Sequence, residues 1–517
     1  MKNGRILRRI TAAALAACMA FMLSGCAGRG KEEKPAAPTL PPADVSMEAP
    51  DGDRAVRQAG NYTVYIPLAD ELQLTARSIH VEESSLQATV EVLAKALLEA
   101  VGGNGGGTLS LYRDQTPEIS GGICTVNLDP SALSLSYSDY YRLSIAMATT
   151  LCGLDEIDGI NVLTADKSVA LDTAGNLAMG TLTGHPGENL PVLWEQMEAK
   201  RAPLGNNVNR TPLSAAATIY YPLPDGRGIG CESQLLTFPG QTPDQLAETL
   251  MTALDQTMKR RSGNGNLPAL ADQYPEGQQE EKYRYLERMP VVTDRNNGGR
   301  TVNILFRNDI YELLEGWDTD LSCLIAAITC TMITFIPDVE EISVRIDGVP
   351  VTEMGNQFHP AATQSVVFQR SDAALFLTST VSVFFEKDGK LVRCEKPVER
   401  EQADSPRVVL GALLEGPNRR ERENGINATL PAGVQDQDIQ GIAADGDTLL
   451  VNLSGDFRDM IRDYGGDREA LLCYSMVNTL CYNSGMRRVC FFFDGGQAET
   501  IAGDVYWSGE FIYNPGI

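Results

Sequence analysis

One pattern occurs three times along the chain, and it limits the possible folds more than any other feature. Each occurrence opens with a short alternating strand, which the sequence predicts at Tyr62–Pro67, Ala217–Pro222 and Val381–Phe385. A helix follows, then a strand centred on a Val-Asn pair, a second helix and a closing strand. The pairs are Val126-Asn127, Val302-Asn303 and Val451-Asn452. We therefore expect a row of similar small units, the alternative being a chance alignment of unrelated α/β segments.

The helices in this pattern carry apolar residues at helical spacing. In the third unit the first helix is predicted to start at Ser405-Pro406, and in the second unit at Thr242-Pro243, both good cap and first-turn pairs. The second helices are predicted over residues 141–151, 320–334 and 468–482. The predicted fold class is α+β, with tandem small domains, each a mixed β-sheet with two helices packed on one face.

Three domains follow from this pattern, at residues 61–195, 214–356 and 376–517. The second is interrupted by a polar insertion at about residues 258–300, which we expect to be an exposed excursion. Asp347-Gly348 and Asp494-Gly495 end the closing strands of the last two units and predict tight turns. Function should therefore be sought in the shared unit.

The N-terminal 26 residues have the layout of a secretory signal. A basic cluster precedes an apolar run from Ala12 to Leu23, which is too short for an ordinary membrane-spanning helix. The run closes with Leu23-Ser24-Gly25-Cys26, which resembles the bacterial lipobox. That resemblance implies that Cys26 becomes the first residue and carries fatty-acyl chains such as palmitate. The alternative is a plain signal peptide with an incidental cysteine.

The next segment, residues 27–60, is rich in Lys, Glu, Pro, Ala and Asp and has few large apolar groups. It cannot bury enough surface to offset its ordering entropy, so we expect a disordered tether. Its prolines favour extended polyproline II, which would hold the folded part away from a lipid bilayer.

Charge and cysteine usage narrow the possible partners. The formal net charge is −25, which disfavours nucleic acid and anionic lipid surfaces. Apart from Cys18 and Cys26, nine of the 11 cysteines remain, and no two form a Cys-x-x-Cys pair. We expect them to be buried free thiols, although the sequence leaves their disulfide status open. The three histidines, His80, His185 and His359, neighbour no cysteine cluster, so we expect neither a metal nor a cofactor.

The third unit resembles a known family, the GerM (GerMN) domain of sporulation and spore germination, over about residues 378–517. The similar blocks are Leu413-Leu414-Glu415-Gly416-Pro417, Leu430–Val434, Val451–Ser454 and Val477–Leu480. The first two units resemble the family more loosely. The resemblance implies a non-catalytic extracytoplasmic domain, commonly on lipoproteins of spore-forming bacteria. It also implies a fold similar to ring-building domains, which pack the helices of one subunit against the sheet of the next.

No catalytic motif is present. The chain lacks the patterns of serine hydrolases, zinc proteases, phosphate loops and dinucleotide-binding folds. Gly102–Gly107 follows a helix and is interpreted as a flexible loop. Glu415 is the most plausible catalytic acid, but a solvated residue in the last turn of a helix explains it better. The aromatic tail (Tyr506, Trp507, Phe511 and Tyr513) could line a groove, but core or a docking edge explains it better.

The sequence therefore predicts a non-catalytic, lipid-anchored protein on the extracytoplasmic face of the cell membrane. Its GerM-like domains would associate with other envelope or sporulation proteins, or with one another, in sporulation or germination. The alternatives are a solute- or wall-binding lipoprotein and a peptidoglycan-acting enzyme. The only expected modification is lipidation of Cys26.

Overall fold

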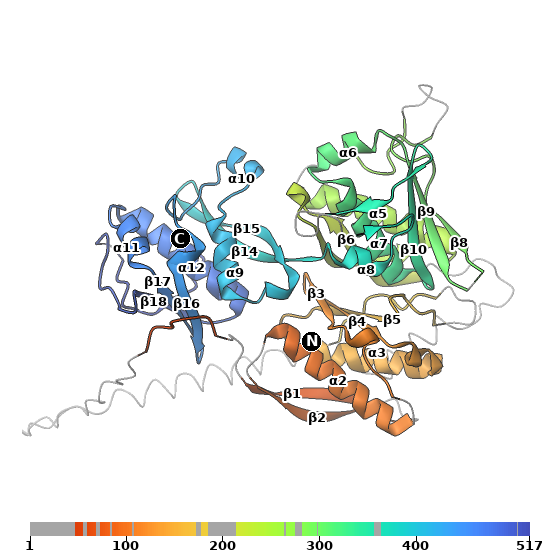
Figure 1. Ribbon diagram of the computed structural model, residues 1–517, viewed down its shortest axis with the longest axis horizontal. Helices are drawn as coiled ribbons and strands as arrows, with labels where there is room; N and C mark the ends of the chain where they lie inside the picture. The colour runs from red at the N-terminus through yellow and green to blue at the C-terminus, as the bar shows by residue number, and fades with distance from the viewer. Residues whose placement is uncertain are drawn as a thin grey trace, which may run out of the picture. The chain divides into compact units, whose positions relative to one another are not determined.

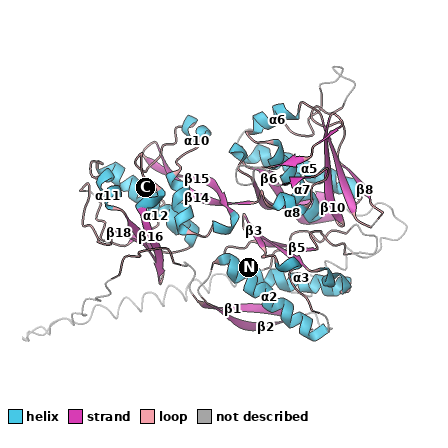
Figure 2. Ribbon diagram, viewed as in Figure 1, coloured by secondary structure: helices cyan, strands magenta, loops and turns pink. Residues whose placement is uncertain are grey.

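Helices and strands alternate along the described chain, and residues Ala49–Ile517 form one compact unit in the computed structural model (Figures 1 and 2). The predicted α+β class is confirmed. The predicted signal peptide and Cys26 lie outside the described residues. The structure describes residues 47–54, 59–68, 73–82, 85–105, 108–171, 177–184, 213–262, 265–274, 282–296, 298–355, 363–503 and 505–517.

The first unit consists of a β-hairpin, a helix and a small mixed sheet. Strands β1 and β2 are antiparallel, β3 is antiparallel to β4, and β4 is parallel to β5. Helix α3 connects the parallel pair, which needs a crossover of this kind. The elements are β1 (Gly60–Pro67), β2 (Leu74–Val81), α2 (Leu86–Gly105), β3 (Glu118–Ser120), β4 (Ile123–Leu128), α3 (Tyr137–Leu151) and β5 (Gly159–Thr164).

The second unit repeats this order with additions. Its hairpin pairs β6 with β7, β8 is antiparallel to β9, and β9 is parallel to β10. The elements are β6 (Leu213–Pro222), β7 (Ile229–Phe238), α5 (Pro243–Arg261), β8 (Val291–Asp294), β9 (Arg300–Phe306), α6 (Ile310–Trp317), α7 (Leu321–Phe335), β10 (Val339–Ile346), β11 (Val349–Pro350), β12 (Glu353–Met354), β13 (Thr363–Gln364) and α8 (Arg370–Ala374).

The third unit has the same plan. Its hairpin pairs β14 with β15, β16 is antiparallel to β17, and β17 is parallel to β18. The elements are β14 (Thr378–Lys387), β15 (Lys390–Glu399), α9 (Pro406–Leu414), α10 (Arg419–Glu423), β16 (Ile439–Asp445), β17 (Thr448–Leu453), α11 (Gly455–Ile461), α12 (Gly466–Ser484), β18 (Arg488–Phe493) and β19 (Phe511–Ile512). Short 3-10 helices occupy Tyr112–Asp114, Pro130–Ser134, Pro224–Gly226, Arg400–Gln402 and Asp436–Asp438.

A hydrogen bond at the same place in each unit shows that the three units are equivalent. A threonine near the end of the second helix accepts from a backbone N–H of the first hairpin strand. The pairs are Tyr65 N to Thr150 Oγ1 at 2.9 Å, Tyr220 N to Thr331 Oγ1 at 3.0 Å, and Phe384 N to Thr479 Oγ1 at 3.2 Å. Each threonine side chain thereby joins the helix to the hairpin.

The parallel strand pair is also in the same register in each unit. The valine of each Val-Asn pair faces one apolar residue of the closing strand, and the three pairs are Val126 with Val162, Val302 with Ile342, and Val451 with Phe491. All six side chains are buried. The repeat therefore extends from the order of the elements to individual residue pairs.

The described apolar residues form two core clusters. One is continuous through the first and second units, from Val64 to Leu377, and the other contains residues of the third unit from Val381 to Phe511. The cluster that spans two units crosses the boundary predicted between residues 195 and 214. The exact domain boundaries stay a prediction.

Among the described residues, no single helix has the length and hydropathy of a membrane span. One pair, α6 with α7, meets both criteria only when its two helices are taken together across a bend of 91°. Thirteen residues of α7 are buried inside the folded chain, from Cys323 to Phe335.

Four details of the predicted organisation were wrong or incomplete. Each unit opens with a two-stranded hairpin, so the strands β2, β7 and β15 were missed. Helix α2 continues to Gly105, so Gly102–Gly105 is helical rather than a loop. The tether was predicted to be disordered to residue 60, but Pro50–Arg54 hydrogen-bond to the third unit.

The fourth correction concerns the polar insertion of the second unit. Leu270 and Leu286 are fully buried and Tyr285 is 2% exposed, so the prediction of an exposed excursion is wrong for these residues. The segment at Leu270 is held by Asp255 on α5, which is itself buried and accepts from Leu270 N at 2.8 Å and Ala271 N at 3.3 Å. Leu286 also forms a β-bridge with Phe306.

Asp255 makes stability depend on pH. Burial raises its pKa to about 7, partly offset by the two backbone hydrogen bonds. In the unfolded chain an aspartate has a pKa of about 3.9. Between these values the unfolded state loses its proton first, so the free energy of unfolding falls as pH rises, by on the order of 3 kcal/mol. We expect Asp255→Asn to remove this loss, measured as urea unfolding at pH 4.5 and 7.5.

Asp294→Asn is the matched control, because the Asp294 side chain is 87% exposed. It should keep the wild-type dependence on pH. Equal pH slopes for Asp255→Asn and wild type would contradict the role of Asp255.

Candidate functional site

The residues that could support catalysis are dispersed. Among the described residues, no group of three or more His, Cys, Asp or Glu is placed to hold a metal ion. His80 lies exposed on β2, with Nδ1 3.1 Å from Asn61 Oδ1. His185 and His359 lie outside the described residues. The histidines therefore offer no assembled acid–base site in the described part of the chain.

Glu415 caps the C-terminal end of α9. Its side chain is 49% exposed, and Oε2 accepts from Arg227 Nη1 at 2.7 Å. The interpretation as a helix-end residue is confirmed, with the ion pair as an addition that the sequence did not reveal.

The nine cysteines of the described chain are buried free thiols, as predicted. Burial raises the pKa of Cys231 and Cys330 to about 12, and the pKa of Cys481 and Cys490 to about 11. Nucleophilic attack and metal binding both need the thiolate, so these thiols are inert at neutral pH. Cys26, the predicted lipidation site, lies outside the described residues.

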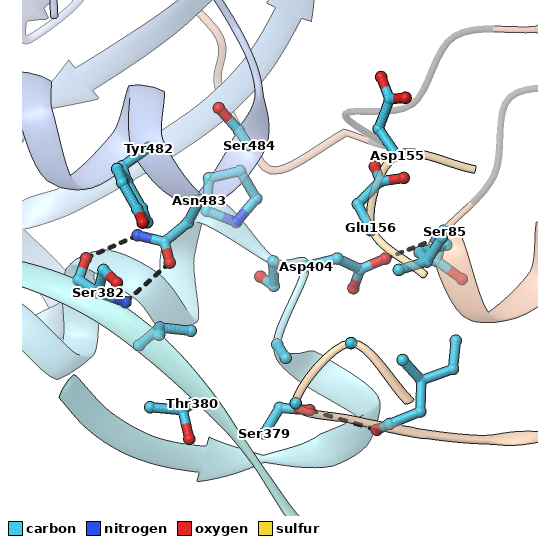
Figure 3. Close-up of a pocket in the computed structure, with 18 of the residues that line it drawn as sticks. Ser85, Asp155, Glu156, Ser379, Thr380, Ser382, Asp404, Tyr482, Asn483 and Ser484 are labelled. Carbon is cyan, nitrogen blue, oxygen red and sulfur yellow. Dashed lines mark hydrogen bonds between the residues drawn. The ribbon is translucent and has the colours of Figure 1, made fainter. Parts of the chain in front are cut away.

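A cavity of about 970 Å³ lies beside β14 and the C-terminal end of α12 (Figure 3). Its volume is in the range of small-molecule sites. Its polar lining is largely bonded within the protein. Asn483 accepts from Ser382 N at 2.9 Å and donates to Ser382 O at 2.7 Å, and Asp404 Oδ2 accepts from Leu86 N at 2.7 Å. These amide and carboxylate groups are therefore already engaged in bonds within the protein.

The aromatic tail divides between core and surface. Trp507 is fully buried and Phe511 is 7% exposed, whereas Tyr506 is 62% exposed. Tyr513 is 38% exposed and packs against Phe384 and Tyr482, with ring centroids 5.9 and 6.4 Å apart. The prediction of core is confirmed for Trp507 and Phe511, a docking edge stays a prediction, and none of the four residues lines the cavity.

The most specific polar contact between units joins the sheet of the first unit to the hairpin of the second. Asn161 Oδ1, on β5, accepts from Thr218 Oγ1, on β6, at 3.1 Å. Thr125 Oγ1, on β4, lies 3.5 Å from Tyr220 OH. Thr181 N donates to Ala216 O at 2.8 Å, and Thr181 Oγ1 donates to Asn161 Oδ1 at 2.9 Å. The five side chains that make these contacts are at most 6% exposed. The sheet face of one unit thus binds the hairpin of the next, and two different surfaces meet.

Comparison with known proteins identifies the third unit. Residues 382–499 match the family model Germane, described as sporulation and spore germination. The third unit is therefore similar to a sporulation and spore germination family. The match lies inside the predicted third domain and confirms the resemblance seen in the sequence. No curated protein sequence matches the chain.

Solved structures with which the chain aligns include GerM domains. The tandem GerMN domains of the sporulation protein GerM from Bacillus subtilis align with 58% of this chain and 98% of their own, at 15% identity and a TM-score of 0.21. The first GerMN domain alone covers 26% of this chain and 98% of its own, at 18% identity and a TM-score of 0.21. A Clostridium perfringens protein classed as a lipoprotein aligns with 26% of this chain and 87% of its own, at 16% identity and a TM-score of 0.19.

Proposed function

We propose that this chain is a non-catalytic, lipid-anchored protein of the extracytoplasmic membrane face, whose GerM-type units bind other proteins in sporulation or spore germination. The family match supports the biological setting, because residues 382–499 match a sporulation and germination domain. The inert thiols and the dispersed histidines give no support to an enzyme.

The observation that carries the association role is the contact between the first and second units. There the sheet residues Thr125 and Asn161 bind the hairpin residues Thr218 and Tyr220 through buried side chains. A contact between two different surfaces of one repeated unit can be made again by further units, within the chain or between chains. This contact within the chain therefore supports the proposed association.

The lipid anchor rests on the sequence Leu23-Ser24-Gly25-Cys26. Each buried methylene of an acyl chain contributes about 0.8 kcal/mol, so two acyl chains would fix the protein stably to the bilayer. We expect wild-type protein to incorporate labelled palmitate and to sediment with membranes, and Cys26→Ala to do neither. Cys18→Ala is the control and should behave as wild type. Labelling of the Cys26→Ala protein would contradict the anchor.

Cross-linking in sporulating cells, followed by capture of the chain, tests the association role. We expect covalent products that contain a second envelope protein or a second copy of the chain. Recovery of monomer alone at every stage would contradict the proposal. Heat of binding with peptides, sugars or germinants would instead support a solute-binding lipoprotein, and release of fragments from purified sacculi would support a peptidoglycan-acting enzyme.

A further inference from the structure

Residues Pro50–Arg54, called the strap below, bind to the sheet of the third unit. The Asp53 carboxylate accepts from Ile442 N at 3.0 Å and from Arg407 through Nε at 2.5 Å and Nη2 at 3.1 Å. Arg54 N donates to Ile442 O at 2.9 Å, and Asn452 Nδ2 donates to Pro50 O at 3.1 Å. The strap is therefore held by backbone and side-chain bonds at both of its ends.

The strand that receives the strap has a glycine where the two backbones approach most closely. A Cβ atom on Gly441 would lie 2.6 Å from Gly52 N and 2.7 Å from Pro50 O. Any other residue at position 441 would push the strap away. The close contact therefore depends on the glycine in β16 as well as on the strap.

Asp53 and Arg54 bond to the backbone of β16 at the edge of the sheet, whereas Pro50 and Gly52 lie against Gly441 and Asn452, on the face that does not belong to the third unit's core. In β17 and β18, Leu449, Val451 and Phe491 belong to the core cluster, whereas Leu450, Asn452, Cys490 and Phe492 do not. Successive residues of a strand point to opposite sides, so these four side chains share the outer face. They are at most 6% exposed. Three of the four side chains are apolar, whereas the face of a sheet that is in contact with water normally carries polar side chains.

The same face of the first unit binds the second unit. The register aligns Val126 with Val451, which places Thr125 at the position of Leu450 and Asn161 at the position of Cys490. Thr125 and Asn161 are the residues that meet Thr218 and Tyr220 of β6. In the third unit the outer face therefore corresponds to a surface that takes the hairpin of a following unit.

The hairpin of the first unit is the matching free surface. The threonine bonds align Tyr65 with Tyr220, and hence Thr63 with Thr218. Thr218 and Tyr220 are each 1% exposed, whereas Thr63 is exposed and Tyr65 is half-buried. The row of units thus begins with an uncovered hairpin and ends with a sheet face to which the strap is bound.

We propose that the strap closes a self-association face on the third unit, and that the first-unit hairpin of a second copy of this chain binds there once the strap leaves. This deepens the association function proposed above and depends on it. The Asp53 and Arg407 side chains are 41% and 26% exposed, and an ion pair in partial contact with water is weak enough to be displaced. The contact would be head-to-tail, so it could add further copies.

The test compares Asp53→Ala with Asp51→Ala in the purified chain, because Asp51 is an exposed strap residue for which the structure gives no bond to the third unit. We expect Asp53→Ala to speed hydrogen exchange at the Ile442 and Arg54 amides. In sedimentation velocity it should self-associate at a concentration at least about tenfold lower than wild type. Asp51→Ala should match wild type in both measurements. Adding Thr63→Arg to Asp53→Ala should restore the monomer.

Two results would overturn the proposal. Unchanged exchange at Ile442 in Asp53→Ala would mean that Asp53 does not hold the strap. Faster exchange without greater self-association would mean that the face beneath the strap does not bind a second copy. Neither result bears on binding to other envelope proteins, which cross-linking in cells tests separately.

Discussion

Replacing Glu118 by alanine is expected to lower the free energy of unfolding by about 3–5 kcal/mol, because it leaves a buried guanidinium without its carboxylate. Arg370, on α8, is 2% exposed, and Nη2 donates to Glu118 Oε2, on β3, at 2.6 Å. Its remaining bonds, to Thr334 Oγ1 at 2.7 Å and Tyr220 OH at 3.4 Å, are to neutral acceptors. Urea unfolding monitored by far-UV circular dichroism measures the loss.

The exposed ion pair of Glu91 and Lys95 is the control for this experiment. Their side chains are 25% and 47% exposed, so Glu91→Ala should cost less than about 1 kcal/mol. Adding Arg370→Met to Glu118→Ala should recover part of the loss, because an apolar side chain of similar length needs no partner. A cost for Glu118→Ala no larger than that for Glu91→Ala would mean that the pair does not join the first two units.

Local sequence predicted the elements that depend on local chemistry. Thr242-Pro243 starts α5 with a complete capping box to Gln245, as the cap and first-turn residues indicate. Asp347-Gly348 and Asp494-Gly495 form turns in which both residues have positive φ, between 45° and 79°. These features involve neighbours in the chain, so one sequence is enough to find them.

The missed hairpin strands had weaker local signals. Most of β2 is exposed and lacks apolar alternation. One signal was overlooked: Asp388-Gly389 joins β14 to β15 through a two-residue turn, with φ of 53° and 77°. The same Asp-Gly rule that located the other two turns would have found this hairpin.

The candidate association surfaces could not be predicted from one sequence. The ion pair of Arg370 with Glu118 joins residues 252 positions apart, and the bond of Asp53 to Ile442 spans 389. Periodicity carries no information on such pairs, because Arg370, Glu118 and Asp53 are each consistent with a solvated charge when the sequence is considered alone. The prediction of a disordered tether failed for the strap because polar bonds to the third unit hold it and because Pro50 is buried.

Replacing Glu469 by alanine is expected to destabilise the third unit by about 4–5 kcal/mol, because two buried N–H donors and one half-buried N–H donor lose a charged acceptor. Glu469 is fully buried in the first turn of α12. Its carboxylate accepts from Trp507 Nε1 at 2.8 Å, Ala502 N at 3.1 Å and Val505 N at 3.2 Å. The side chain therefore fixes the C-terminal segment against the helix. Urea unfolding monitored by tryptophan fluorescence measures the loss.

Glu469→Gln should cost less than Glu469→Ala, because the amide oxygen still accepts from Trp507 and Ala502 while the amide nitrogen faces the N–H of Val505. Glu510→Ala is the matched control in the same unit, since Glu510 is 41% exposed and pairs only at the surface with Arg488. That change should cost less than about 1 kcal/mol. Equal effects for Glu469→Ala and Glu510→Ala would show that the buried carboxylate does not hold the C-terminal segment, and Trp507 would then be fixed by apolar packing alone.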